Sequence, residues 1–152
     1  MRLLLSIIVL VLSGCGTRDT GPIAPLIDRI DATATVRVIE DEPPSLLSTV
    51  SVRNQSQESV EFVVLRDCPV GARLYGASGG DEVLAYDGGQ EPCTRAGRPV
   101  RIGPGESEVL SDTVRLTELS ARGVVAGRYR AVAIVTAGPD AFEVSAGEVS
   151  VP

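Results

Sequence analysis

Most of the chain alternates apolar and polar residues with a period of two, the pattern of a half-buried β-strand. From Thr33 onward this alternation recurs in short segments: TATVRVI, LLSTVSVRN, RPVRI, SEVLSDTVRL, GRYRAVAIVT and FEVSAGEVSV. Turn-forming segments separate them, among them EDEPPS, NQSQES, YDGGQEP, GPGES and AGPDA. The spacing predicts an all-β fold for residues 32–152, an antiparallel β-sandwich of about seven to nine strands.

Two segments depart from this regular pattern. Segment 60–66, VEFVVLR, alternates less cleanly than its neighbours, and we predict that it is a central strand. Segment 112–122, DTVRLTELSAR, is the one stretch of the domain with helical character. We expect its Leu116 and Leu119 to close one end of the sandwich from a turn or two of helix.

Two details indicate an immunoglobulin-like topology for the sandwich. The Gly-Pro-Gly turn at 103–105 reverses one strand sharply into the next. Tyr129 follows Gly127 at the start of a strongly apolar strand. A tyrosine in that place can bury its ring and return its hydroxyl to a nearby backbone group, as in a tyrosine corner. The alternative is that Tyr129 is an ordinary strand aromatic.

The segment 1–14, MRLLLSIIVLVLSG, breaks the alternation with a continuous apolar run. This run, 3–12, has Ser6 as its one polar member, and it is shorter than the roughly 20 apolar residues that cross a bilayer. Arg2 before it and small residues after it match a secretory signal peptide. We therefore expect residues 1–14 to be a signal peptide; a short buried helix is the alternative.

The end of the apolar run, Leu12-Ser13-Gly14-Cys15, resembles the lipobox of bacterial lipoproteins. The resemblance implies lipid attachment to the Cys15 sulfur, cleavage before Cys15, and usually acylation of the new amino group. Two or more acyl chains anchor a protein stably in a membrane. Gly16 stands where inner-membrane lipoproteins carry Asp. The expected location is therefore the exported face of the cell membrane or outer membrane, held there by lipid.

Residues 15–31 contain glycines and prolines without a clear period, which is typical of a tether between anchor and domain. A flexible segment of about 15 residues spans roughly 20 Å and would hold the domain near the membrane. The alternative is that the apolar residues of this segment dock on the domain as an edge strand: Ile23, Leu26, Ile27 and Ile30.

The cysteines that remain after Cys15 form an even pair, Cys68 and Cys93. In an oxidising compartment such a pair is expected to form a disulfide. The bridge would close a loop of about 25 residues and contribute about 3.5 kcal/mol. Free thiols, or a functional redox pair, are the alternatives; a redox pair usually has Cys-x-x-Cys spacing.

The domain also carries a motif order known from one protein family. Its residues are Val52, Asn54, Ser56, Val60 and Phe62, then the GPGES segment at 103–107, then Gly127, Tyr129, Ala131 and Ala133. This order resembles the immunoglobulin-like domain of the bacterial intracellular proteinase inhibitor (BsuPI) family, over about residues 33–151. The resemblance implies an immunoglobulin-like sandwich and, as a possible activity, inhibition of proteinases.

Composition narrows the possible functions further. The net charge of −6 argues against nucleic-acid binding, which needs clustered positive charge. The chain has no His, which excludes Ser-His-Asp and Cys-His catalytic arrangements and removes the commonest metal ligand. It also has no Lys and therefore no Schiff-base chemistry. We expect a non-enzyme without cofactor or metal; a hydrolase that uses carboxylates is the remaining catalytic alternative.

Two groups of loop residues are candidate sites. Acidic residues in the glycine-rich loops lack the Asp-x-Asp-x-Asp-Gly pattern of a calcium loop, so solvated turn acids are the favoured interpretation of Asp81, Glu82, Asp87, Glu91 and Asp140. The second group is Tyr86 with Arg95, Arg98 and Arg101, which surround Cys93 in sequence. Arginine and tyrosine are frequent in protein interfaces, so we expect an interaction surface here; a solvated strand edge is the alternative.

Taken together, these features predict a lipid-anchored, exported lipoprotein whose immunoglobulin-like domain is a non-catalytic binding or structural module at the cell envelope. Its predicted partners are the membrane, through the lipid on Cys15, and a protein; no nucleic acid is expected. The alternative function is inhibition of proteinases of the cell envelope or exterior.

Overall fold

The computed structural model describes residues 25–76, 82–86, 96–136 and 141–152; of residues 83–86 it describes the backbone. These ranges contain nine strands and two short helices. In chain order they are α1 (Leu26–Arg29), β1 (Ile30–Ile39), β2 (Ser45–Asn54), β3 (Val60–Leu65), β4 (Val70–Gly76), β5 (Glu82–Tyr86), β6 (Gly97–Ile102), β7 (Ser107–Arg115), α2 (Leu116–Ala121), β8 (Gly127–Val135) and β9 (Phe142–Val151).

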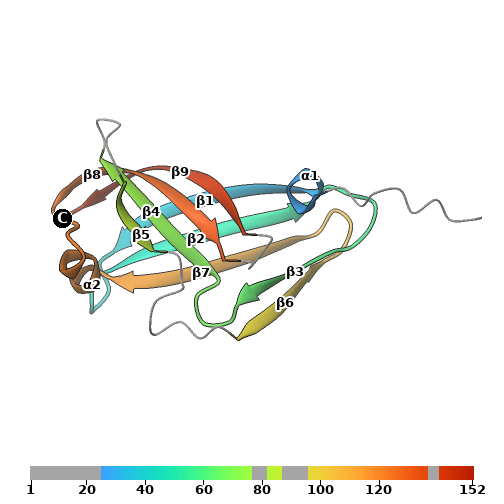
Figure 1. Cartoon of the computed structure of the whole chain (residues 1–152), viewed down its shortest axis with the longest axis horizontal. Coiled ribbons are helices and arrows are strands. Elements are labelled where there is room, and N and C mark those ends of the chain that lie inside the picture. The colour runs from blue at the N-terminus through green and yellow to red at the C-terminus, as the bar shows by residue number, and fades with distance from the viewer. Residues whose placement is uncertain (1–24, 77–81, 87–95, 137–140) are drawn as a thin grey trace, which may run out of the picture.

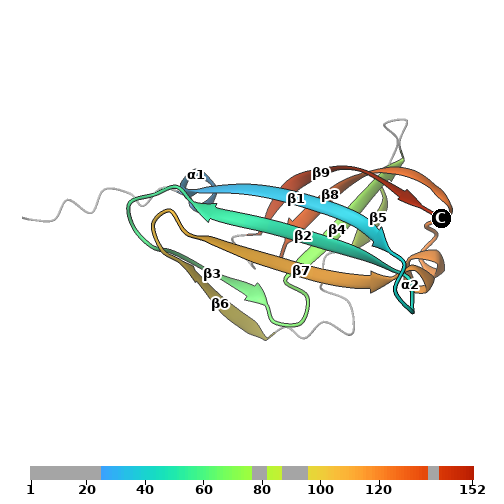
Figure 2. The ribbon, with the colours of Figure 1, turned by 180° about the vertical axis from the view of Figure 1, so that it is seen from behind.

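The strands form two facing sheets and a ribbon (Figure 1). One sheet has the order β1-β2-β7 and the other β5-β4-β8-β9, while β3 and β6 pair with each other. Every pairing is antiparallel. Figure 2 shows the three-stranded sheet in front of the four-stranded one, with β1 and β9 side by side along one edge. The predicted all-β antiparallel sandwich is confirmed.

The core follows from the alternation in the sequence. On each strand every second side chain points inward, so the β2 residues Leu46, Val50 and Val52 face the β4 residues Val70 and Leu74 across the sandwich. All five are at most 1% exposed. Side chains of valine size and larger fill the space between two sheets about 10 Å apart.

Strands β2 and β7 continue into the ribbon through a sharp corner. Between β2 and β3 the chain turns at Asn54, and between β6 and β7 it turns at Gly105, whose φ of 74° suits glycine. Asn54 is fully buried, and its side-chain nitrogen donates hydrogen bonds to the carbonyls of Glu58 and Ile102 at 2.7 and 3.0 Å. This corner folds the β3–β6 ribbon back toward the sandwich (Figure 1).

The prediction that segment 60–66 is a central strand is wrong. Within the described residues, β3 pairs with β6 alone. Its inward residues, Phe62 among them, are buried, whereas Val63 on the outer face is 49% exposed. The exposed valine blurs the alternation in the sequence. Phe62 contacts Phe142 of β9 edge to face, with ring centroids 6.3 Å apart, and thereby joins the ribbon to the four-stranded sheet.

Both ends of the sandwich are covered by short helices. Leu119 of α2 is fully buried and Leu116 packs against the core, as predicted, although residues 112–115 extend β7 and are not helical. At the other end, Leu26 of α1 packs against the core and Ile30 is buried. Residues 26–31 therefore fold with the domain, and the predicted tether extends too far into it.

The predicted tyrosine corner is confirmed. The ring of Tyr129 is buried at the start of β8, and its hydroxyl bonds to the backbone of Val125.

The two described helices are short: α1 has four residues and α2 has six. Neither of these described helices is long and apolar enough to cross a bilayer.

Candidate binding face

The interaction loop predicted around Cys93 is described only in part. Cys93 and Arg95 lie outside the described residues, as does Cys15. Tyr86 is the last residue of β5, where its backbone lies opposite Ala72 of β4. The lipid attachment, the disulfide and this loop surface therefore stay predictions.

Arg98 and Arg101 lie on β6, and the structure separates them. Arg98 is partly buried, with its guanidinium 4.0 Å from the carboxylate of Glu108. Arg101 is exposed on the other face of the strand, opposite Glu61. Residues three apart on a strand point to opposite faces. Contrary to the prediction, these two arginines do not share one surface.

Cys68 lies in the turn between β3 and β4 and is 3% exposed. The hydroxyl of Thr136, which follows β8, donates a hydrogen bond to the Cys68 carbonyl. The amide of Thr136 also donates to the carbonyl of Pro69 at 3.1 Å. The turn is thus tied to the end of β8 by two hydrogen bonds from one residue.

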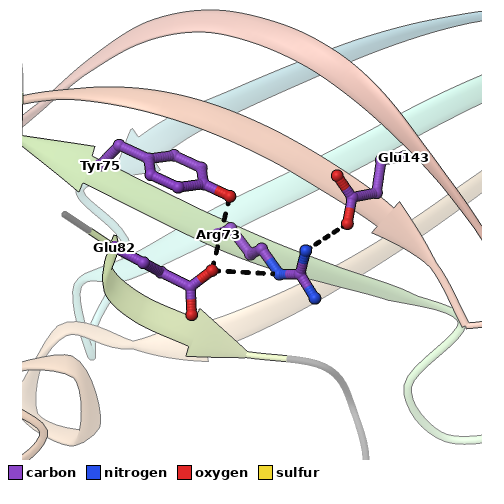
Figure 3. Close-up of polar contacts among 4 residues, drawn as sticks. All are labelled: Arg73, Tyr75, Glu82 and Glu143. Carbon is purple, nitrogen blue, oxygen red and sulfur yellow. Dashed lines mark hydrogen bonds and ion pairs between the residues drawn. The ribbon is translucent and has the colours of Figure 1, made fainter. Parts of the chain in front are cut away.

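A polar cluster that the sequence analysis did not single out lies on the outer face of the four-stranded sheet (Figure 3). We call it the Arg73 cluster: Arg73 and Tyr75 from β4, Glu82 from β5, Arg130 from β8 and Glu143 from β9. It thus draws on all four strands of the sheet. Strand alternation places these side chains on the face opposite to the core.

Arg73 is the centre of this cluster. Its Nε lies 3.3 Å from Oε2 of Glu82, and its Nη1 pairs with Oε1 of Glu143. Arg73 and Glu143 belong to β4 and β9, the two neighbours of β8, so their ion pair spans β8. The β8 residues Val132 and Ile134 are the cross-strand partners of Arg73 and Glu143, and they are only 8% and 7% exposed. An arginine covers apolar surface with its methylene stem while its head remains solvated.

Tyr75 is held from two sides. Its hydroxyl donates a long hydrogen bond of 3.4 Å to Glu82. The guanidinium carbon of Arg130, its cross-strand partner, lies 4.4 Å from the ring centroid. This distance allows a cation–π contact. Tyr75 is therefore contacted by Arg130 at its ring and by Glu82 at its hydroxyl, and Glu82 in turn pairs with Arg73.

The surroundings of Arg73 favour its charged form. Partial burial opposes the charged form, but the carboxylate of Glu143, the contact with Tyr75 and the carboxylate of Glu82 outweigh it and raise the pKa of Arg73 above its usual value. Two arginines and two glutamates make the cluster neutral overall.

The cluster brings arginine and tyrosine side chains together on an exposed face of the sheet. Arginine and tyrosine are the side chains that most often carry the binding energy of protein interfaces. None of the five residues of the cluster is a Ser, Cys, Thr or Lys; its one hydroxyl is that of Tyr75, which donates to the Glu82 carboxylate. Within the described ranges, no three Cys, Asp or Glu residues gather into a metal site.

The sequence contained part of the signal for this cluster. Arg73 and Tyr75 alternate with the core residues Ala72 and Leu74 in ARLYG, which places them on the outer face. Their partner Glu82 lies within ten residues on β5, whereas Arg130 and Glu143 come from β8 and β9, more than fifty residues further along the chain. The register between these strands, which the sequence does not reveal, brings the five side chains together.

Two hollows lie elsewhere on the domain. One, of about 430 Å³, lies at the corner beside Arg53, Ser56 and Pro104 and is open to solvent. The other, of about 490 Å³, lies between β2, β7, α2 and the β3–β4 turn. Its lining residues are Pro43, Ser45, Asp67, Cys68, Asp112, Thr113, Arg115 and Glu118.

Asp112 is the unusual residue of the second hollow. Its Oδ1 accepts a hydrogen bond of 2.7 Å from the amide of Thr113, whereas its Oδ2 is buried and has no hydrogen-bond partner among the described residues. Burial raises the pKa of Asp112 to about 6, although the Thr113 amide acts in the opposite direction.

Comparison with known proteins finds no family model and no curated protein that matches this chain. Among solved structures, a β-glucosidase from Listeria innocua in complex with glucose is similar over 80% of this chain and 16% of its own, at 15% identity and a TM-score of 0.38. DesR, a β-glucosidase from Streptomyces venezuelae, is similar over 80% of this chain and 15% of its own, at 17% identity and a TM-score of 0.40.

A third structure, Northeast Structural Genomics Consortium target SoR45, is similar over 82% of this chain and 89% of its own, at 12% identity and a TM-score of 0.41. The chain thus spans about a sixth of the glucosidases that it resembles. Similarities at these TM-scores carry no argument about function, which has to come from the residues of this chain.

Proposed function

We propose that this protein is an exported, lipid-anchored and non-catalytic binding module, which contacts a protein partner through the outer face of its four-stranded sheet. The observation that carries the proposal is the Arg73 cluster. Four strands contribute to it, and it holds two arginines and a tyrosine in fixed positions on an exposed face. Such side chains dominate the energetics of protein interfaces.

Order within the cluster favours binding. A free arginine or glutamate side chain loses conformational entropy when a partner immobilises it. Here the ion pairs of Arg73 and the contact between Arg130 and Tyr75 already restrict these side chains. A partner surface with alternating acidic and basic groups would complement the face, because each charged residue could exchange part of its hydration for a charge-assisted hydrogen bond.

The lipid anchor is supported by the lipobox-like segment that ends at Cys15. The domain begins at Leu26, the first residue of α1. Residues 15–25 reach at most about 40 Å when fully extended. A lipid on Cys15 would therefore keep α1, the start of the domain, within this distance of the membrane.

Substitution of Cys15 tests the anchor. In bacteria that express the full chain, the wild-type protein is expected to incorporate a labelled fatty acid and to fractionate with membranes. Cys15→Ser is expected to lose both properties, and Cys68→Ser, the matched control, to keep the label. Cleaved, membrane-bound material from Cys15→Ser would contradict the anchor.

Site-specific photo-crosslinking tests the binding face. A crosslinking amino acid at Ser145, exposed on β9 opposite Val132, is expected to capture a protein partner. The control position is Thr35, exposed on β1 in the other sheet. Arg130→Glu in the Ser145 background is expected to reduce the yield. Equal yields from both positions would contradict the assignment of the face.

An assay of the purified domain against a panel of proteinases separates the proposal from the alternative function. A binding module without inhibitory activity leaves every proteinase active at equimolar concentration. Stoichiometric inhibition of a proteinase would instead establish the inhibitor function implied by the family resemblance.

A further inference from the structure

Asp112 occupies an inward position on β7, the edge strand of the three-stranded sheet. Its neighbours in the same phase of the strand are Leu110 and Val114, which are 1% and 4% exposed. Its cross-strand partner on β2 is Ser48, also buried. A carboxyl group and a hydroxyl thus lie side by side among inward-facing apolar residues of these two strands.

One oxygen of this carboxyl group is left without a partner. Oδ1 accepts a hydrogen bond from the amide of Thr113, but Oδ2 is buried and accepts none from the part of the chain that the structure describes. A charged carboxylate with an unsatisfied, desolvated oxygen is unfavourable, whereas a protonated carboxyl group is much less so. The protein surroundings therefore favour the neutral form.

The hollow beside Asp112 offers room for water. Three other charged groups line it: Asp67 in the β3–β4 turn, Glu118 on α2 and Arg115 on β7. Cys68 lines it as well, and β2 contributes Ser45 and no titratable group. At about 490 Å³ the hollow is large enough for several water molecules.

We propose that Asp112 makes this edge of the sandwich proton-sensitive. When its carboxyl group is neutral, the wall formed by β7 and the β3–β4 turn stays closed. When the carboxyl group is ionised, the wall opens so that water of the hollow hydrates Oδ2. This inference rests on the placement of Asp112 and is independent of the proposed function.

The pKa of Asp112, about 6, sets the range in which the switch would act. The pKa of Asp112 in the closed state is raised above its unfolded value of 3.8. Between these two pKa values the closed state therefore binds more protons than an opened or unfolded state. Stability therefore rises as the pH falls through about 6, and is lower at neutral pH. From about pH 7.5 to about pH 5, one unit below the folded pKa, the opening constant is expected to fall about tenfold.

Amide hydrogen exchange on the full chain, expressed as protection factors at the two pH values, tests the proposal. The amide of Thr136 reports on the wall, since it bonds to the Pro69 carbonyl in the β3–β4 turn. We expect its protection to be about tenfold higher at the lower pH in the wild type, and to change far less in Asp112→Asn. Glu118→Gln, which removes another acid of the same hollow, is the matched control and is expected to behave as the wild type.

An equal pH dependence in wild type and Asp112→Asn would overturn the proposal, as would its loss in Glu118→Gln. A direct titration of the Asp112 side-chain carbon by NMR in the wild-type protein guards against a variant that fails to fold. An apparent pKa near 4, the ordinary value for Asp, would also overturn it.

Discussion

The hydroxyl of Tyr129 donates a hydrogen bond of 2.7 Å to the carbonyl of Val125 and accepts one of 3.2 Å from the amide of the same residue. One side chain thereby satisfies both backbone groups of a loop residue that precedes β8. Because the ring is buried among core residues, the loop between α2 and β8 is fixed to the core at this point.

Tyr129→Phe is expected to lower the free energy of unfolding by about 1–2 kcal/mol, since it leaves the Val125 carbonyl and amide without their partner. Urea denaturation of the purified domain measures the change. Tyr75→Phe is the control, because the Tyr75 hydroxyl makes one exposed hydrogen bond of 3.4 Å. Equal decreases in the free energy of unfolding of the two variants would show that the hydrogen bonds of Tyr129 stabilise the domain no more than that of Tyr75.

Asn54→Ala is expected to be more damaging, at about 2–4 kcal/mol. It removes two donors to the carbonyls of Glu58 and Ile102 and an acceptor for the amide of Ser56. Ser56→Ala removes only the hydroxyl, which bonds to Asn54 and Glu58 at the exposed side of the corner, and should lose about 1 kcal/mol or less. Thermal unfolding measures both; the reverse order would contradict the account of the corner.

Phe62→Ala is expected to detach the ribbon from the sandwich, with a loss of about 3–5 kcal/mol. The ring of Phe62 is 2% exposed and contacts Phe142 at the junction of β3 with β9. Val63→Ala, on the exposed face of the same strand, serves as the control and should change stability by about 0.5 kcal/mol or less. Chemical-shift changes confined to β3, β6 and the surroundings of Phe142 would support detachment. A uniform loss of structure would contradict it.

Arg73→Met separates the two roles of Arg73. Methionine keeps much of the apolar stem over Val132 and Ile134 but removes the charge. Arg73→Ala removes both. Since exposed ion pairs contribute little, about 0–1 kcal/mol, we expect Arg73→Met to remain close to the wild type in stability and Arg73→Ala to lose about 1 kcal/mol. Both variants should bind the partner more weakly, which crosslinking from Ser145 measures. A larger loss for Met than for Ala would refute the role of the stem.

Mass spectrometry tests the predicted pairing of Cys68 with Cys93. The mature wild-type chain is expected to gain the mass of two hydrogens on reduction and to react with no alkylating reagent beforehand. Cys93→Ser should lose about 3.5 kcal/mol of stability if the bridge closes its loop as the chain-entropy relation describes. Two alkylatable thiols in the native protein would rule the bridge out.

The sequence alone was sufficient to predict most of the strands, but not which strands pair with one another. A strand with a period-two pattern, such as β8, can be predicted from its own residues. The tyrosine corner could also be predicted, because Val125, the partner of Tyr129, is only four residues away. The Arg73 cluster was missed because it depends on the register of β4 with β8, and of β8 with β9.

For Asp112, the direction of the side chain could be predicted from the sequence, but its surroundings could not. The sequence SEVLSDTVRL places Asp112 in phase with Leu110 and Val114, so its inward position was open to prediction. Its buried oxygen was not, because the hollow beside Asp112 is lined from α2, β2 and the β3–β4 turn, whose positions depend on the fold. Local patterns thus predict which way a side chain points, and long-range packing decides what it meets there.

Strand β1 gives the domain the properties of a spacer. It starts at α1 and runs for ten residues toward the end of the sandwich that carries α2 and the C-terminus (Figure 2). At about 3.3 Å per residue, the β1–β2 turn lies roughly 33 Å from α1. That turn is acidic, with Glu40, Asp41 and Glu42 all exposed. This distance is about four Debye lengths at physiological ionic strength. On an anchored protein oriented with α1 toward the membrane, the acidic β1–β2 turn would lie beyond the screened electrostatic field of the membrane surface. The charges of Glu40, Asp41 and Glu42 would then set the local electrostatic potential.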